Sequence, residues 1–235
     1  MLISILTVAL LARQPPTHIV SAPGYHNHLS LNTIPTRQQG PGSVLLVAHF
    51  HRALRPTKSI LAIAASVTPE PPYGAVHLRV EDDIQSFKHH KAARVGVKKT
   101  FELMLASPPL RDCAADVQRL FVAVDLGLVK DSTDAAMLRG RGPFETTMSF
   151  GGRDAASSFG DASAIVGAIV DMTVAADAKY FVGGMGISTF DRGVVDMRST
   201  RDQYRAAPAT PANCTFMVRR HRGQEPSLRH FTSFP

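Results

Sequence analysis

The chain has 235 residues, of which 44% are apolar and 19% charged, so it is long enough to bury a core as one large domain or two small ones. This composition excludes a collagen-like fibre and a fully disordered chain. The longest apolar run, Leu2 to Ala12, is shorter than the roughly 20 residues of a membrane-spanning helix, which excludes a polytopic membrane protein. The two cysteines, Cys113 and Cys214, allow one disulfide but are too few for a four-ligand zinc site.

The net charge of +7 is concentrated at the two ends of the chain. Residues 1–69 contain 5 Lys or Arg and no Asp or Glu, residues 70–200 contain 15 and 17, and residues 201–235 contain 6 and 2. A polyanion-binding core would carry its own basic excess, and here the middle of the chain is nearly neutral. We therefore expect no nucleic-acid partner, although a basic C-terminal tail that binds acidic partners stays open as another class of function.

The first 42 residues have two interpretations. An apolar stretch near the N-terminus is typical of a secretory signal, which favours the secretory pathway without excluding the cytoplasm. The alternative is a buried strand at the edge of an incomplete domain. Because residues 14–43 are rich in proline and glycine, we expect 1–42 to be a leader or linker, 43–205 to be the folded domain, and 206–235 to be a basic tail.

Strand-like and helix-like segments alternate along the middle of the chain. In chain order the sequence predicts a strand at 43–50, a helix at 56–67, a strand at 73–81, helices at 82–87 and 92–106, a strand at 119–128 with its core at 121–124, a helix at 163–178, a strand at 179–184, and a helix at 188–199. This alternation indicates an α/β fold with a Rossmann-like parallel sheet.

In sheets of this kind, ligands bind beyond the carboxyl ends of the strands. That rule selects three places in the sequence, namely residues 77–83, 125–128 and 183–190. The first of them has His77 and Arg79 on the same face of a strand, because side chains alternate along it. Arg79 can hold a phosphate through two hydrogen bonds, and His77 can donate to a second phosphate or to a base. The alternative is a local ion pair between Arg79 and Glu81 or Asp82.

The third place is a glycine-rich turn that leads into a helix. Ser188 and Asp191 match the S-x-x-D capping pattern, so the helix is predicted to begin there. Its free N–H groups, with the hydroxyls of Ser188 and Thr189, can bind phosphate oxygens. The alternative is a capped turn that holds no ligand. Neither GxGxxG nor GxxxxGK[ST] occurs, which disfavours a dehydrogenase-type dinucleotide fold and a P-loop kinase.

Three motifs, HLRVEDD preceded by YGAV, a strand ending in FVAVD, and YFVGGMGISTFDRGVVDMR, together resemble the GDP-fucose protein O-fucosyltransferase family, including its plant members. The resemblance covers about residues 43–200. It implies the C-terminal, sugar-nucleotide half of a GT-B glycosyltransferase, with the N-terminal domain of the family largely missing. It also implies inverting transfer of fucose from GDP-fucose to a protein or glycan hydroxyl, without a metal or other cofactor.

The resemblance assigns a donor-site role to seven residues. These are His77 and Asp125 at the guanine, Arg79 at the β-phosphate, Ser188, Thr189 and Phe190 in the diphosphate loop, and Asp171 at the nucleoside end. Arg79 would neutralise the departing diphosphate, which makes it the expected catalytic residue. Asp191 stands where many members have serine. Because the family's acceptor domain has no counterpart here, a truncated fragment or a non-catalytic module that binds GDP or GDP-fucose is the alternative.

Overall fold

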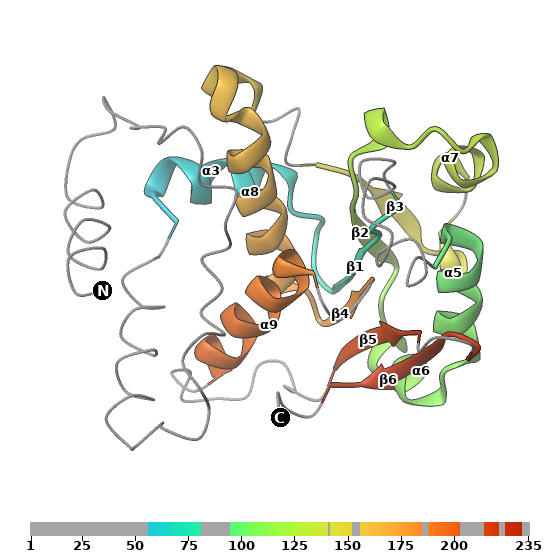
Figure 1. The fold of residues 1–235 in the computed structure, drawn as a ribbon. Helices are drawn as coiled ribbons and strands as arrows, with labels where there is room; N and C mark the ends of the chain where they lie inside the picture. Colours follow the sequence, from blue (N-terminus) through green and yellow to red (C-terminus); the bar gives the residue numbers. More distant parts are fainter. Residues whose placement is uncertain are drawn as a thin grey trace, which may run out of the picture. The chain divides into compact units, whose positions relative to one another are not determined.

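The computed structural model describes residues 56–80, 95–140, 142–151, 156–184, 188–202, 214–220 and 224–231. All of them belong to one compact unit, Pro56–Pro235. They form an α/β fold with a six-stranded, mostly parallel sheet and six α-helices (Figure 1). The expected leader at 1–42, the strand at 43–50 and the helix at 82–87 lie outside the described residues.

The sheet is built from strands whose spatial order differs from their order in the chain. The order is β3-β2-β1-β4-β5-β6, and only β6 runs antiparallel to its neighbour. The strands are β1 (Tyr73–His77), β2 (Arg119–Ala123), β3 (Thr147–Ser149), β4 (Tyr180–Gly183), β5 (Thr215–Arg219) and β6 (Ser227–His230). The chain thus extends the sheet on one side of β1 and then crosses over to continue on the other side. The point where the order reverses lies between β1 and β4, and the predicted parallel α/β sheet is confirmed.

Helices cover both faces of this sheet (Figure 1). One face carries α3 (Lys58–Val67), α8 (Ser163–Asp177) and α9 (Thr189–Asp202), and the other carries α5 (Val97–Ala106), α6 (Pro108–Ala114) and α7 (Ser132–Arg139). None of the helices in the described part of the chain is long and apolar enough to cross a membrane.

Alternation along the strands produces two separate cores. In β1, Ala75 packs with the residues of α8 and α9, whereas Val76 packs with those of α5 and α6. In β2, Phe121 and Val122 divide between the cores in the same way. The strands are therefore apolar on both faces, as parallel strands between two helical layers must be. His77 has the parity of Ala75, which directs its side chain to the face covered by α9.

The helix boundaries follow from capping residues. Thr57 begins α3, and its side chain accepts a hydrogen bond from the backbone N–H of Ile60 at 3.4 Å. Ser107 ends α5 and caps α6, because its hydroxyl accepts from the N–H of Leu110 at 3.4 Å. The following proline, Pro108, suits the first helical position. This local stop explains why the helix predicted to end near residue 106 is followed at once by a second helix that the sequence analysis did not predict.

The expected domain end at residue 205 is too early. β5 and β6 lie within 206–235, the range expected to be a basic tail, and both pair into the sheet. Residues Thr215 to Val218 are buried, and the positive charge that suggested a tail lies on residues that follow them, of which Arg219, Arg220 and Arg229 are exposed. The strand expected at 73–81 is also shorter than predicted, since β1 ends at His77.

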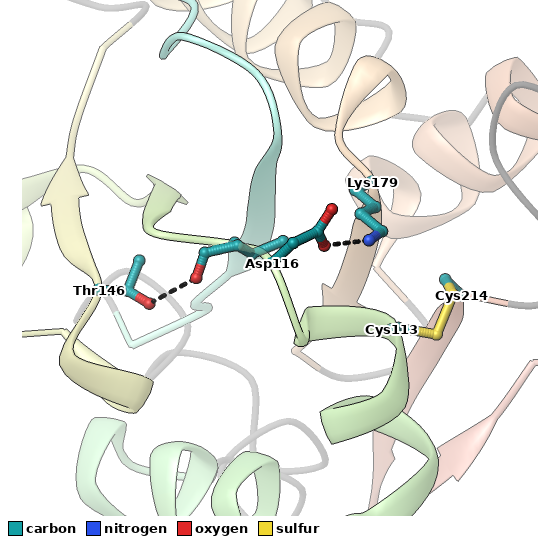
Figure 2. A network of polar contacts seen from close by, with 6 residues as sticks. Cys113, Asp116, Thr146, Lys179 and Cys214 are labelled. Carbon is teal, nitrogen blue, oxygen red and sulfur yellow. Dashed lines mark hydrogen bonds and ion pairs between the residues drawn. A yellow bond between two sulfur atoms is a disulfide. The ribbon is translucent and has the colours of Figure 1, made fainter.

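A disulfide and several hydrogen bonds connect the segments that lead into the strands (Figure 2). A disulfide joins Cys113, in α6, to Cys214, which immediately precedes β5. The ammonium group of Lys179, just before β4, donates to Asp116, just before β2, and this hydrogen bond lowers the pKa of Asp116. The hydroxyl of Thr146, just before β3, donates to a backbone carbonyl at 3.5 Å. All of these contacts lie at the amino edge of the sheet, opposite the strand ends that the sequence analysis selected.

Removing the disulfide should destabilise the fold without changing its topology. The two cysteines are 101 positions apart in the sequence. A disulfide that closes a loop of this length restricts the unfolded chain, and this restriction stabilises the folded state by about 3–5 kcal/mol. The double variant Cys113→Ser/Cys214→Ser should therefore unfold at a lower urea concentration than the parent. The parent under reducing conditions is the control and should match the variant. Equal midpoints for variant and oxidised parent would contradict the bond.

Candidate functional site

His77, the last residue of β1, lies at the centre of a buried cluster. Its Nδ1 is 2.7 Å from Oδ1 of Asp191, in the first turn of α9, and the two residues are 5% and 1% exposed. The imidazole also stacks on the ring of Phe190, with centroids 4.2 Å apart and planes 29° apart. We call His77, Phe190 and Asp191 the His77 cluster. It joins two segments 114 residues apart at the carboxyl edge of the sheet.

Two glycines allow the end of β4 to approach this cluster closely. A Cβ on Gly184 would lie 2.6 Å from the carbonyl oxygen of His77 and 3.3 Å from the backbone nitrogen of Arg79. A Cβ on Gly183 would lie 2.9 Å from Cγ of Asp191. Backbone atoms cannot move aside as a flexible side chain can, so only glycine fits beside His77 at position 184. The glycine-rich turn thus brings β1, β4 and α9 together at the point where the strand order reverses.

The start of α9 follows the predicted capping pattern in part. The hydroxyl of Ser188 accepts a hydrogen bond from the N–H of Phe190 at 3.2 Å, and the helix begins at Thr189. Asp191 contributes its negative charge to the positive end of the helix and also binds His77. The carboxylate of Asp191 is buried and is bound to His77, so it is not exposed to solvent at the start of α9.

Arg79 and Asp125 lie at the same edge of the sheet. Arg79 is half-buried and follows the end of β1 by two residues. The intervening Leu78 donates its N–H to the carbonyl of Ala123 at 3.1 Å, which keeps this segment beside the end of β2. Asp125 follows β2, and its carboxylate accepts from the N–H of Gly127 at 3.1 Å. The structure therefore brings Arg79 near His77, and it gives the Asp125 carboxylate a capping role in its own turn.

Asp171 lies away from the strand ends, in the middle of α8. Burial raises the pKa of its carboxyl group to about 8. Its Oδ1 is buried and has no hydrogen-bond partner among the described residues. A carboxyl group in such surroundings is mainly protonated at neutral pH. The structure does not bring Asp171 to the edge that the other six predicted residues share.

Arg198, the last residue of the YFVGGMGISTFDRGVVDMR motif, lies at the opposite edge. Its Nε donates to Oγ1 of Thr215 at 3.0 Å, and its Nη1 donates to the carbonyl of Ala178 at 2.6 Å. The side chain is 6% exposed and satisfies carbonyls at the end of α8 that would otherwise be unpaired. Arg198 thus joins α8, α9 and β5 at the amino edge, and it does not contribute to a site near His77.

The sequence analysis missed the contact between Asp191 and His77. The S-x-x-D pattern accounts for Asp191 as part of a helix cap and does not indicate a second partner. The signal that could have predicted this contact is a histidine at the end of one strand together with an acidic residue in the first turn of the helix that follows a second strand. That signal becomes informative only when the two strands are known to be neighbours, as β1 and β4 are.

Two surface hollows lie elsewhere on the described part of the chain. One, of about 380 Å³, lies between α3 and α8, and the other, of about 270 Å³, is lined by residues at the start of α5 and near the turn between β5 and β6. Neither is lined by a residue of the His77 cluster. The candidate site is therefore defined by the contacts at the carboxyl edge. In the described part of the chain, no three His, Cys, Asp or Glu side chains are grouped as metal ligands would be.

Neither the models of known protein families nor the curated proteins gave a match to the chain.

Gly184→Ala should destabilise the protein by about 1–3 kcal/mol, because the added Cβ would overlap the carbonyl of His77 and force the backbone apart. Thermal or urea unfolding measures the loss. Gly140→Ala is the matched control, since the nearest atom to its Cβ would be 3.4 Å away. If both variants are equally stable, the close approach of β4 to β1 is wrong.

Asp171 should make the free energy of unfolding depend on pH. Its folded-state pKa of about 8 lies above the ordinary 3.8, so between these values the folded protein binds more protons than the unfolded chain. This contribution to stability is full below the lower value and is lost as the pH rises through the upper one. Asp171→Asn should remove that dependence in urea titrations at several pH values. Asp112→Asn, on the exposed side of α6, should retain it. A pH dependence unchanged in Asp171→Asn would contradict the assignment.

Proposed function

We propose that this protein is a glycosyltransferase of the O-fucosyltransferase type, in which Pro56–Pro235 is a Rossmann-like domain that binds GDP-fucose. The observation that carries the proposal is the meeting of two motifs at one edge of the sheet. His77 and Arg79 of the HLRVEDD motif adjoin the start of α9 in the YFVGGMGISTFDRGVVDMR motif, through contacts of His77 with Phe190 and Asp191. These motifs are distant in the chain, and a common nucleotide site requires them to be close.

The position of this meeting point supports nucleotide binding. Open α/β sheets bind their ligands at the carboxyl edge where the strand order reverses, and here that point lies between β1 and β4. The N-terminus of α9, with the hydroxyls of Ser188 and Thr189, suits phosphate oxygens. The guanidinium group of Arg79 suits the same diphosphate, because its planar fork can donate two parallel hydrogen bonds.

In the proposed reaction, Arg79 stabilises the negative charge that develops on the departing diphosphate. The acceptor oxygen forms a bond to the anomeric carbon of fucose while the bond from that carbon to the diphosphate breaks on the opposite face, which inverts the configuration. The acceptor hydroxyl loses its proton to a base, and GDP departs with the bonding electrons. Because negative charge grows on the departing diphosphate, a fixed guanidinium stabilises the transition state more than the ground state.

In this proposal the domain is the donor half of a GT-B enzyme that acts on a protein or glycan in the secretory pathway. The disulfide between Cys113 and Cys214 supports that location, because such bonds persist in oxidising compartments.

A non-catalytic module that binds GDP or GDP-fucose is the second candidate. It is favoured by the carboxylate of Asp191, which occupies the first turn of α9 and competes with a diphosphate for the positive end of that helix. Incubation with GDP-fucose and acceptor peptides separates the two candidates. Sustained release of GDP supports transfer, whereas GDP binding without turnover supports the module.

The proposal predicts that GDP raises the melting temperature of the purified protein more than ADP does, because a ligand that binds only the folded state stabilises it. Arg79→Lys should weaken GDP binding roughly ten- to a hundredfold, through loss of one charge-assisted hydrogen bond worth about 1.5–3 kcal/mol, and should leave the unfolding midpoint without ligand unchanged.

Arg119→Lys is the matched control for this experiment. Arg119 pairs with Glu70 at 2.6 Å at the amino edge of the sheet, so the same substitution there should leave GDP affinity unchanged. If millimolar GDP does not raise the melting temperature of the parent, the nucleotide proposal is wrong. If Arg79→Lys binds GDP as tightly as the parent, Arg79 is a structural residue.

A further inference from the structure

The imidazole of His77 has one satisfied ring nitrogen and one that the described residues leave without a hydrogen-bond partner. Nδ1 binds the carboxylate of Asp191 at 2.7 Å, and no partner is present for Nε2 in the described part of the chain. The residue is 5% exposed, and the ring is held by stacking on Phe190. A ring nitrogen that no group of the protein occupies is available to a ligand. Nε2 is therefore the atom of the His77 cluster that is suited to meet a ligand.

The partner of Nδ1 determines what Nε2 can do. A carboxylate only accepts hydrogen bonds, so the ring nitrogen that faces Asp191 carries a hydrogen. A neutral imidazole has one such hydrogen, which leaves Nε2 as an acceptor. We propose that Asp191 is a positioning residue that fixes His77 in this tautomer, and that Nε2 receives an N–H or O–H group of the ligand.

This assignment selects between the two uses of His77 that the strand pattern alone left open, a phosphate contact and a base contact, and it agrees with the guanine role that the resemblance implies. Phosphate oxygens accept hydrogen bonds, so they do not match an acceptor at Nε2. The N–H groups on the edge of a guanine match it, and so do the hydroxyl groups of a sugar. Resting on the proposed function, the inference places the base or the sugar of the donor at His77 and leaves the diphosphate to Arg79 and the N-terminus of α9. It also gives Asp191 a role that differs from that of the serine found in many family members.

The tautomer can be measured directly in the full chain without any ligand. Histidine carrying an isotope label in its ring nitrogens is incorporated, and nitrogen NMR near neutral pH identifies which nitrogens carry hydrogen. The chain has 10 histidines, so the signals of His77 are assigned by their loss in His77→Gln. We expect a hydrogen on Nδ1 and none on Nε2, which is the less common tautomer of a free histidine side chain. A hydrogen on Nε2, alone or together with one on Nδ1, would overturn the proposal.

Asp191→Asn tests the positioning role. An amide can donate to Nδ1 as well as accept from it, so the variant should populate both tautomers. The matched control is Asp196→Asn, which makes the same charge change farther along α9 and should leave the spectrum of His77 as in the parent. If Asp191→Asn also leaves the tautomer unchanged, Asp191 does not position the ring.

Three probes then identify the group that reaches Nε2. Guanosine, fucose and pyrophosphate are titrated separately into the parent and both variants. A shift of the Nε2 signal with guanosine or with fucose supports the acceptor role and names its source, and the affinity of that probe should fall roughly tenfold in Asp191→Asn alone. Pyrophosphate should bind Asp191→Asn at least as tightly as the parent, because the variant loses a negative charge at the start of α9. The appearance of a hydrogen on Nε2 with pyrophosphate would overturn the proposal. If none of the probes nor GDP binds, the proposed function fails, and the spectrum of the free protein still decides the tautomer.

Discussion

Five of the six strands run parallel, and this constraint organises the rest of the molecule. Each parallel neighbour requires a crossover, so helices cover both faces of the sheet and the strands are apolar on both sides. Polar groups that follow or precede a strand are consequently confined to the two edges. All carboxyl ends of these strands meet at one edge, which is why His77, Arg79 and the start of α9 come together although they are far apart in the chain.

The two edges have different properties. At the amino edge, the disulfide, the pair formed by Asp116 and Lys179, and the side chain of Arg198 connect the segments that enter β2, β4 and β5 (Figure 2). In these contacts, groups of the protein are paired with one another. At the carboxyl edge, one buried hydrogen bond joins β1 to α9, and Nε2 of His77 has no partner among the described residues. We infer that the amino edge stabilises the fold and that the carboxyl edge provides the binding groups.

Much of the fold could be predicted from the sequence, because strands buried on both faces are continuous apolar runs and α8 and α9 have clear beginnings. β5 was missed because the arginines beside it suggested a solvated tail, whereas its buried residues are four in a row and too few to stand out. α6 and α7 are short, with 7 and 8 residues, and show little helical periodicity.

The candidate site was only partly predictable for a different reason. The rule that ligands bind at strand ends placed His77, Arg79 and Ser188 correctly at one edge, since it needs only the position of each strand. The contact of His77 with Asp191 depends on β1 and β4 being neighbours, and sequence patterns do not give the strand order. Arg198 belongs to the same sequence motif as Ser188, yet its buried hydrogen bonds hold it at the other edge, so membership of one motif does not place two residues at one site.

We propose that the carboxyl edge between β1 and β4 binds a guanine nucleotide, and mapping of backbone amide NMR signals tests this proposal most directly. Spectra of the full chain are compared with and without GDP. We expect the largest changes on the amides of residues 78–80, 183–184 and 189–191, while those of Asp116, Lys179 and Thr215 stay in place. Changes centred on the amino edge, or no changes at saturating GDP, would contradict it.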